Sequence, residues 1–333
     1  MKFHFEFDIK KLSYPIDYHH HLLLMGSCFT ENMGDKLKKL KFSTLENPNG
    51  ILFNPVSVAE AIDSYISNRQ LTINDLFFYN ETWHSWNHHS RFSEISQSDA
   101  ISKMNDSIAL AHDFLKKADH LMITLGSAWV YTFTHQAANS VIGKVAANNH
   151  KAPANWFLKK LMTVEETLTI WEELLKKIFL FNPNLTIIFT ISPVRHLGEG
   201  VIENNRSKAV LIQTVHQLIE KFDRSYYFPA YELVIDDLRD YRFYAEDLVH
   251  PNYQATQYVW EKFTESCMDE KTKLLIKEIT EMNQAYQHKP LNPFTERHQK
   301  FLMAYNTKID ILQTKYPFLD FENESAYFKN KIM

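Results

Sequence analysis

The sequence predicts a three-layer α/β/α fold, with a central parallel sheet covered by helices on both faces, followed by a C-terminal helical extension. Three short apolar runs have the continuous pattern of buried parallel strands. Each run ends at small or turn-forming residues: Gly26-Ser27, Gly126-Ser127 and Ser192-Pro193. The three predicted strands are Leu22 to Met25, Leu121 to Leu125 and Leu185 to Ile191.

Helical patterns lie between these strands, and this alternation is the pattern of a parallel sheet with crossover helices. Two further strands are predicted at Lys41 to Leu45 and at Tyr226 to Phe228. Thr163 and Glu166 form a capping-box pattern at the start of one helix. The helices are expected over residues 30–40, 56–67, 101–118, 164–181 and 205–222.

Composition argues against several classes of function. The chain has 333 residues, of which 45% are apolar, enough for a sizeable core. It carries 36 Lys and Arg against 40 Asp and Glu, so the formal net charge is −4 and gives no reason to expect nucleic acid as a partner. The two cysteines, Cys28 and Cys267, are too few for a disulfide framework and fit a reducing compartment.

No targeting or membrane segment is evident in the sequence. The first residues, Met1 to Asp8, alternate like a strand and lack the apolar stretch of a signal peptide. The apolar runs are far shorter than the ~20 residues that span a bilayer. We therefore expect a soluble, cytoplasmic protein without a membrane partner.

The chain is expected to divide into a main domain, residues 1–265, and a helical extension, residues 266–333. The extension carries two amphipathic patterns, Lys271 to Gln287 and Thr295 to Tyr316. These helices either pack on the main domain or mediate self-association into a homo-oligomer. Residues 75–91 have little regular period and predict an ordered insertion.

Ser27 stands where the first predicted strand meets a helix. Open α/β sheets bind ligands at the carboxyl ends of their strands. A serine hydroxyl becomes nucleophilic when a base removes its proton, and free N–H groups at a helix N-terminus stabilise an oxyanion. The alternative is an N-cap serine that only satisfies helix amides.

Asp247 and His250 supply a carboxylate and an imidazole three residues apart, so both side chains can lie on one side of a turn. With Ser27 they make the parts of an acyl-transfer triad, which is recognised by role rather than by chain order. The alternative is a surface aspartate beside a capping histidine.

Several segments together resemble the GSCFA-domain family, which is grouped with the SGNH (GDSL-like) hydrolases. The match at the first strand is Met25-Gly26-Ser27-Cys28-Phe29-Thr30, with Thr30 where the family name has alanine. The similarity covers roughly residues 10–265. The other matching segments are Asn47 to Pro55, His88 to Phe92, Leu125 to Tyr131, Ser192 to His196 and Asp240 to Asp247.

The resemblance implies roles for individual residues. Ser27 would be the nucleophile, His250 the general base and Asp247 the carboxylate that orients it. Gly50 matches a glycine whose N–H faces the oxyanion. Ala128 stands where related enzymes have an asparagine that completes the oxyanion hole, and losing one such donor costs about 3–4 kcal/mol.

Other groups could replace the missing asparagine or bind substrate. Candidates for the missing donor are Ser127, Asn148 or Asn149, His89 and Arg91, and the sequence does not choose among them. Arg195 and His196 follow a predicted strand, and Arg206 and Lys208 begin the next helix, so these cations could grip a carboxylate or phosphate. Equally, they are surface charges paired with Glu199 and Glu203.

No metal or other cofactor is predicted. The tract His19-His20-His21 and the cluster of His84, His88 and His89 lack the spacing and the accompanying cysteines of a zinc site. We expect a serine esterase that forms an acyl-enzyme and acts on a small-molecule or carbohydrate ester. The alternatives are an acyltransferase with the same triad and a binding protein that keeps the fold without turnover.

Overall fold

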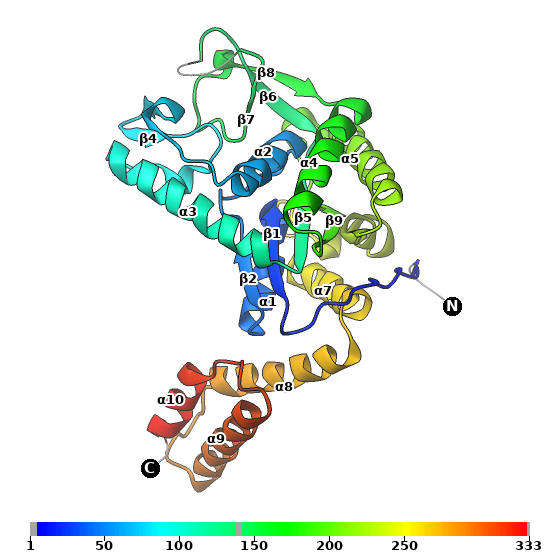
Figure 1. The fold of residues 1–333 in the computed structure, drawn as a ribbon. Helices are drawn as coiled ribbons and strands as arrows, with labels where there is room; N and C mark the ends of the chain where they lie inside the picture. The colour runs from blue at the N-terminus through cyan, green and yellow to red at the C-terminus, as the bar shows by residue number, and fades with distance from the viewer. Residues whose placement is uncertain (1–4, 138–141, 332–333) are drawn as a thin grey trace.

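The computed structural model describes residues 5–137 and 142–331. Its centre is a five-stranded parallel sheet with the order β10-β9-β5-β1-β2 (Figure 1). Helices cover both faces, and further helices follow at the C-terminal end, so the predicted fold class is confirmed. The strands are β1 (His21–Gly26), β2 (Ser43–Glu46), β5 (His120–Leu125), β9 (Thr186–Ile191) and β10 (Ser225–Tyr227).

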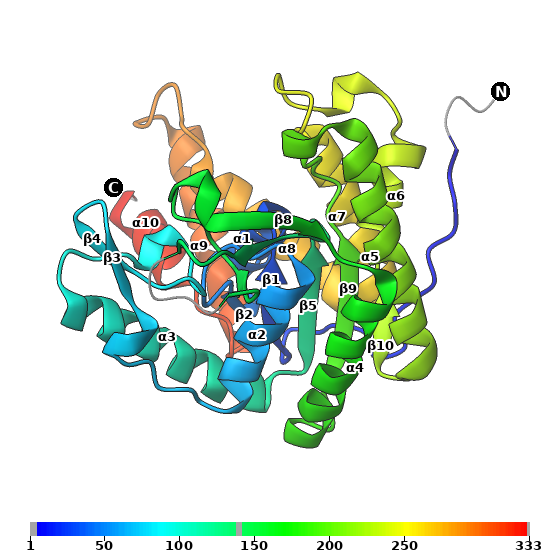
Figure 2. The ribbon, with the colours of Figure 1, turned by 90° about the horizontal axis from the view of Figure 1, so that it is seen from above.

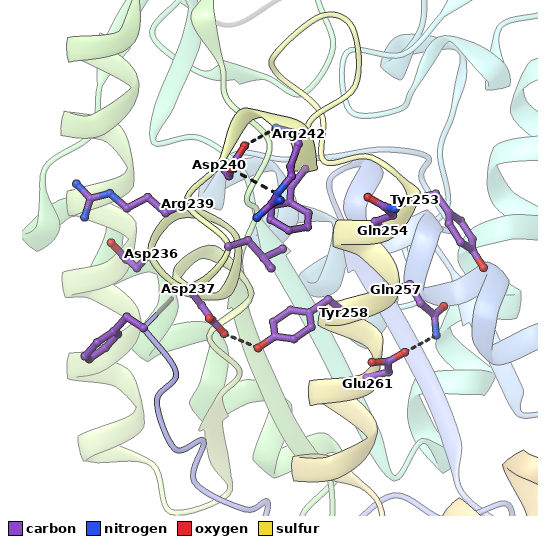
Figure 3. A pocket seen from close by; sticks show the side chains of 13 residues that line it. Asp236, Asp237, Arg239, Asp240, Arg242, Tyr253, Gln254, Gln257, Tyr258 and Glu261 are labelled. Carbon is purple, nitrogen blue, oxygen red and sulfur yellow. Dashed lines mark hydrogen bonds and ion pairs between the residues drawn. The ribbon is translucent and has the colours of Figure 1, made fainter. Parts of the chain in front are cut away.

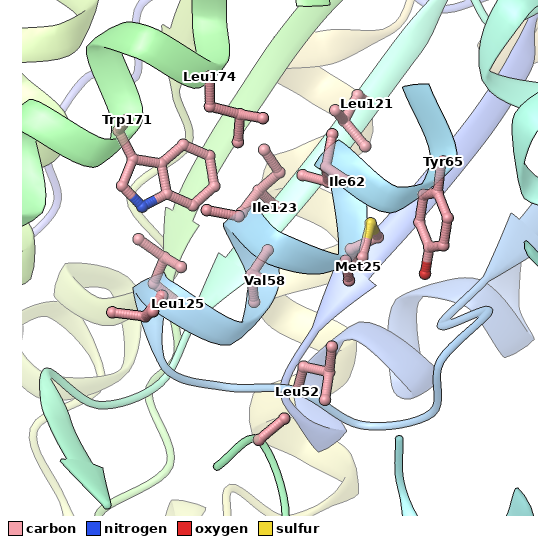
Figure 4. Close-up of a cluster of buried hydrophobic side chains, with 14 of the residues drawn as sticks. Met25, Leu52, Val58, Ile62, Tyr65, Leu121, Ile123, Leu125, Trp171 and Leu174 are labelled. Atoms are coloured by element: carbon pink, nitrogen blue, oxygen red, sulfur yellow. The ribbon is translucent and has the colours of Figure 1, made fainter. Parts of the chain in front are cut away.

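Side chains alternate between the two faces of this sheet, as the two-residue period of a strand requires. Leu23, Met25 and Ile123 face one core, which Figure 4 shows packed against Val58, Ile62, Trp171 and Leu174. The helices on this face are α2 (Pro55–Ile66), α3 (Gln97–Lys117), α4 (Val164–Phe181) and α5 (Val201–Lys221).

The opposite face is covered by a second core that continues into the C-terminal helices (Figure 2). Leu22, Leu24 and Met122 belong to this core. The helices here are α1 (Cys28–Lys39), α6 (Ala230–Glu232), the π-helix η5 (Leu233–Asp237), α7 (Tyr253–Cys267), α8 (Glu270–Gln287), α9 (Glu296–Lys315) and α10 (Glu322–Lys331).

The C-terminal helices are fixed to the end of α1. Asn283 donates a hydrogen bond to the carbonyl of Lys39 (2.7 Å), and Lys41 pairs with Glu324 (2.8 Å). The expected amphipathic helices of this extension are thus present, and they pack on the main domain. Self-association stays a prediction, as does the domain boundary at residue 265.

Two small antiparallel sheets interrupt the α/β pattern. One is the hairpin β3 (Phe77–Tyr79) and β4 (Thr82–His84), within the segment expected to be an ordered insertion. The other follows β5 and lies at the end of the molecule opposite the C-terminal helices (Figure 1). Its strands, β6 (Trp129–Phe133), β7 (Val145–Ala146) and β8 (Phe157–Leu161), were not predicted, because β8 is largely exposed and lacks an apolar run.

Short 3-10 turns complete the described elements: η1 (Ile73–Asp75), η2 (Ser90–Phe92), η3 (Ala154–Trp156), η4 (Leu197–Glu199) and η6 (Tyr241–Phe243). Residues 5–8, whose apolar and polar side chains alternate as in a strand, pair with no strand. The chain that follows them is held by the end of α7 instead, through the N–H groups of Leu12 and Ile16. Residues 1–4 lie outside the described part. Within that part, none of the helices has the length and apolar character needed to cross a bilayer.

The sheet topology places a switch point between the ends of β1 and β5. The chain leaves β1 into α1 on one face, and it leaves β5 toward α4 on the other face. Neighbouring strands whose connections depart to opposite faces form the switch point at which α/β sheets bind ligands. Gly26 ends β1 with φ +137°, and a Cβ there would lie 2.2 Å from the carbonyl oxygen of Thr124.

We therefore expect Gly26→Ala to destabilise the fold. The added methyl would overlap the backbone of β5 and would force an L-residue into a left-handed conformation, a cost of about 3 kcal/mol or more. Urea unfolding followed by circular dichroism measures the loss. Gly198→Ala is the control, because nothing lies within 4 Å of its Cβ position. Equal effects of the two substitutions would contradict this account of Gly26.

Candidate active site

Ser27 lies at the carboxyl end of β1 and is the N-cap of α1. Its Oγ accepts a hydrogen bond from the N–H of Phe29 (3.3 Å), and its own N–H donates to the carbonyl of Thr124 (3.2 Å). The side chain is buried. Both sequence interpretations are thus compatible with this geometry, since the capping serine also stands at the strand end where a ligand would bind.

Asp247 and His250 form a hydrogen-bonded pair on the loop between η6 and α7. Asp247 Oδ2 lies 2.7 Å from His250 Nδ1, and Asp247 Oδ1 accepts the N–H groups of Val249 (2.9 Å) and His250 (3.0 Å). These hydrogen bonds lower the pKa of Asp247 to about 2. A carboxylate only accepts, so it favours the imidazole tautomer with the proton on Nδ1 and a lone pair on Nε2.

Arg195 fixes this loop to the edge of the sheet. It follows β9, and its guanidinium donates to the carbonyl of Leu248 (2.9 Å) while lying over the ring of Tyr244 (4.3 Å). The backbone N–H of Arg195 also donates a hydrogen bond to the carbonyl of Val249 (3.4 Å). Arg195 thus brings the imidazole loop to the sheet edge that carries Ser27.

The serine and the imidazole are not in contact in this structure. Among the described residues, no hydrogen bond joins Ser27 Oγ to either ring nitrogen of His250. His250 is half exposed, with 51% of its side chain accessible, whereas Ser27 is 2% exposed. The assignment of all three residues to a triad therefore stays a prediction.

His196 lies between the end of β5 and the His250 loop. Its ring packs against Phe53 (4.8 Å between centroids), and a Cβ on Gly126 would lie 3.1 Å from its Nε2. Burial, then the charges of Lys208 and His250, lower the pKa of His196 to about 4. The ring is therefore neutral at pH 7, and it can act there as a polar wall of the site but not as a cation.

Gly50 is held in a tight turn after β2. It has φ +82°, and its N–H donates to the carbonyl of Asn47 (2.7 Å). The amide expected to face the oxyanion is therefore occupied in this structure. A Cβ on Gly50 would lie 2.2 Å from Cβ of His89, so the glycine allows the segment that carries His89 to approach closely.

His89 and Arg91 reach the same edge through this turn. The N–H of His89 donates to the carbonyl of Asn49 (2.8 Å), and the Arg91 guanidinium donates to the carbonyl of Asn47. Arg91 also lies 3.8 Å from Glu31 of α1. Burial and the neighbouring Arg91 charge lower the pKa of His89. Either side chain carries an N–H group that could serve as a donor at this edge.

The side chains of Ser127 and Asn148 make hydrogen bonds to other residues of the fold. Ser127 Oγ lies 3.2 Å from Ser207 Oγ and accepts the N–H of Trp129 (3.1 Å). Asn148 Oδ1 accepts the N–H of His150 (2.8 Å) in a turn beside β7. In the described residues neither side chain is hydrogen-bonded to Ser27, so the expected oxyanion role stays a prediction.

The sequence interpretation missed two polar groups at this edge, Asn47 and Asn204, and named a third, Lys208, only as a cation that grips a ligand or as a surface charge. Asn47 Oδ1 accepts the N–H of Gly26 (2.9 Å) and fixes the end of β1. Asn204 Oδ1 accepts the N–H of His196 (2.9 Å). Lys208 is the third, and it is buried rather than a surface charge.

A sequence signal for Lys208 was available. Asn204, Lys208, Leu211 and Val215 recur at helical spacing, so they share the buried stripe of α5. Of the two acids expected to pair with these cations, Glu203 does bind Arg206 (2.8 Å), whereas Glu199 binds Lys159 instead.

The buried histidines of the insertion pack with aromatic rings. The rings of His84 and His150 lie 4.6 Å apart and both contact Phe77. Burial lowers the pKa of both, that of His150 to about 4. Within the described ranges, no group of three or more His, Cys, Asp or Glu side chains is arranged to hold a metal ion.

A large cavity lies on the far side of the His250 loop. Its volume is about 950 Å³, and neither Ser27 nor His250 lines it (Figure 3). Its wall is joined to the loop, because Asn252 donates from its side chain to the carbonyl of Arg242 (2.7 Å) and from its N–H to that of Phe243 (2.9 Å). Other lining residues are Asp236, Asp237, Arg239, Asp240, Tyr253, Gln254, Gln257, Tyr258 and Glu261.

The fold and this edge define a three-layer α/β/α protein with a central parallel sheet, a serine after the first strand and an aspartate–histidine pair before a late helix. The GSCFA family model matches residues 21–263, and a model described as the C-terminal domain of GSCFA domain proteins matches residues 279–333. The chain belongs to the GSCFA family.

Two solved structures resemble the chain at low similarity. One is a carbohydrate esterase family 3 protein from Talaromyces cellulolyticus, with 11% identity and a TM-score of 0.34 over 78% of this chain and 99% of that one. The other is a mutant acetyl esterase with an acetate ion, with 10% identity and a TM-score of 0.33 over 78% and 99%. Comparison with the curated proteins gave no match.

We expect Arg195→Ala to release the His250 loop while leaving the fold intact. The variant loses the hydrogen bond to Leu248 and the contact with Tyr244, both near the surface, so the melting temperature should change by no more than about 2 °C. Limited thermolysin digestion should cut the loop near Leu248 faster than in the wild type. Arg206→Ala, which loses only an exposed pair with Glu203, is the control. Equal digestion of both variants would show that Arg195 does not hold the loop.

The hydrogen bonds that the Asp247 carboxylate accepts in its loop should depend on pH. Its folded pKa of about 2 lies below its ordinary value of 3.8, so its hydrogen bonds are fully present above pH 3.8 and are lost as the pH falls through about 2. The amide resonances of Val249 and His250 in ¹H–¹⁵N spectra should titrate with a midpoint near that lower value. A midpoint at the ordinary value would contradict the hydrogen bonding, and Asp247→Asn should abolish the titration.

Proposed function

We propose that this chain is a serine esterase that transfers an acyl group to Ser27 and then to water. The observation that carries the proposal is the Asp247–His250 pair, 2.7 Å apart, held by Arg195 at the sheet edge where Ser27 follows β1. Hydrogen bonds hold Asp247 ionised at neutral pH, and an ionised carboxylate stabilises the imidazolium that forms during acyl transfer.

The first half of the reaction forms an acyl-enzyme. His250 Nε2 takes the proton from Ser27 Oγ, which attacks the ester carbonyl and forms a C–O bond. The tetrahedral intermediate collapses, its bond to the alcohol oxygen breaks, and the imidazolium gives its proton to that oxygen. In the second half, water gives a proton to His250 and attacks the acyl carbon, which releases the acid and restores the Ser27 hydroxyl.

The proposal requires the His250 loop to close on Ser27 when substrate binds. Catalytic hydrogen bonds are often long or absent without substrate and form in the complex. The Asp247–His250 pair is exposed, so a substrate can reach it. An O-acylated carbohydrate or a related small ester is the substrate class that we propose, by analogy with SGNH-type enzymes.

A binding protein without turnover is the second candidate. Three observations favour it: Ala128 replaces the oxyanion asparagine, the Gly50 amide is occupied, and Ser27 caps α1. An acyltransferase would share every step up to the acyl-enzyme and would differ only in using an acceptor hydroxyl instead of water.

A fluorophosphonate probe separates these candidates. It should label the wild-type protein at Ser27, as mapped by peptide mass spectrometry, and it should not label Ser27→Ala. His250→Ala should stay folded and label about 10²- to 10⁴-fold more slowly, because it lacks the general base. Cys28→Ser is the matched control, since it changes the neighbouring residue and should label normally. Absence of labelling on folded wild-type protein would favour the binding protein.

Hydrolysis of 4-nitrophenyl acetate then tests turnover. We expect Ser27→Ala and His250→Ala to lose activity, and Asp247→Asn to lose less. His250→Ala should keep the wild-type melting temperature, whereas Ser27→Ala should lower it by a few degrees because it removes the cap of α1. A near wild-type rate in His250→Ala would refute its role as the base. Transfer to an added alcohol at the expense of hydrolysis would point to the acyltransferase.

A further inference from the structure

Lys208 is a completely buried lysine at the carboxyl edge of the sheet. It lies on α5 with 1% of its surface exposed. Its Nζ donates hydrogen bonds to the carbonyl of Gly126 (2.6 Å) and to that of Ser192 (2.7 Å). These carbonyls are the first beyond the ends of β5 and β9, so one amine ties two neighbouring strands where the site loops leave them.

No carboxylate compensates this amine. In the described part of the chain, Lys208 takes part in no ion pair with Asp or Glu, and its Nζ lies 5.9 Å from the centroid of the Tyr231 ring. Burial lowers its pKa to about 7, which leaves a large protonated fraction at neutral pH. A neutral amide could tie two carbonyls at a lower desolvation cost, so a lysine here suggests that the charge itself has a use.

The groups that face this charge belong to the candidate site. Burial and then the Glu31 charge raise the pKa of the Cys28 thiol on α1, and the Lys208 charge opposes this rise with the smallest of the contributions. The Lys208 charge also lowers the pKa of His196 in the loop after β9. Cys28 directly follows Ser27, so the field of the ammonium reaches the first turn of α1.

We propose that Lys208 is a positioning residue of the site: its ammonium holds the carbonyl ends of β5 and β9 together and places one positive charge behind Ser27 and Cys28. The second part rests on the proposed esterase function, in which negative charge develops on the substrate at Ser27. The buried cation would offset part of the loss of the donor that Ala128 does not supply.

The pKa of the Cys28 thiol measures the effect of this charge, and the measurement does not depend on enzyme activity. The alkylation rate with iodoacetamide as a function of pH gives the pKa of its thiol, since the thiolate is the reacting form. Cys267 is fully buried, and Cys267→Ser in every variant removes its contribution. Lys208→Met removes the charge with little change in shape, whereas Lys208→Arg keeps it.

We expect Lys208→Met to raise the pKa of Cys28 and to slow its alkylation at pH 8 by about three- to tenfold, the loss of thiolate for a rise of up to about one unit. Lys208→Arg should stay near the wild-type value. A purely structural role would not produce this difference between two folded variants. Equal Cys28 titrations in all three proteins would overturn the proposal.

A measurement on the wild type covers the case in which the variants fail to fold. In protein labelled with [¹³Cε]lysine, one ε-carbon signal should titrate near pH 7, far below the ordinary lysine value of about 10.4. If every lysine titrates at the ordinary value, no buried amine lies behind Ser27 and the proposal fails.

Fluorophosphonate labelling separates failure of this proposal from failure of the esterase assignment. If the wild type is labelled at Ser27, then Lys208→Met should label at least about tenfold more slowly, as expected when an electrostatic contribution to acyl transfer is lost, and Lys208→Arg should recover part of the rate. An unchanged rate in folded Lys208→Met would overturn the positioning role. If the wild type is not labelled, the esterase assignment fails, while the Cys28 titration still decides whether the charge is present.

Discussion

The site depends on the close contact between the ends of β1 and β5. Gly26 has no side chain, so its backbone lies against the carbonyl of Thr124, and the N–H of Ser27 donates to that carbonyl. The side-chain oxygen of Asn47 accepts a hydrogen bond from the N–H of Gly26, and its backbone carbonyl accepts one from the Arg91 guanidinium. Ser27 is therefore placed by backbone contacts with two neighbouring strands rather than by its own side chain.

From this contact the rest of the edge is assembled by the loops that follow each strand. Lys208 joins the chain just beyond β5 to that beyond β9, and Arg195 carries the Asp247–His250 loop to the same edge. The two halves of the site differ in burial. The strand ends are buried and joined by the hydrogen bonds of Lys208, whereas the loop that carries His250 is half exposed. A closing loop over a fixed nucleophile is consistent with a site that assembles around its substrate.

Much of the fold could be predicted from sequence because its strands are continuous apolar runs, as at Leu121 to Leu125. The pairing of Asp247 with His250 followed from their spacing. The occupied amide of Gly50 could not be predicted, since backbone hydrogen bonds in a turn leave no side-chain pattern. For Lys208 the sequence left a ligand-gripping cation and a surface charge both open, because helical spacing places a charged residue on the stripe of α5 but does not show that it is buried.

The most direct test of the account is a crystal structure of the fluorophosphonate-treated protein. We expect a covalent adduct on Ser27 Oγ and His250 Nε2 within about 3 Å of that oxygen, as a general base must be. The account would be contradicted by an adduct on another residue, or by an unmodified Ser27 that still caps α1 with the His250 loop in its present place.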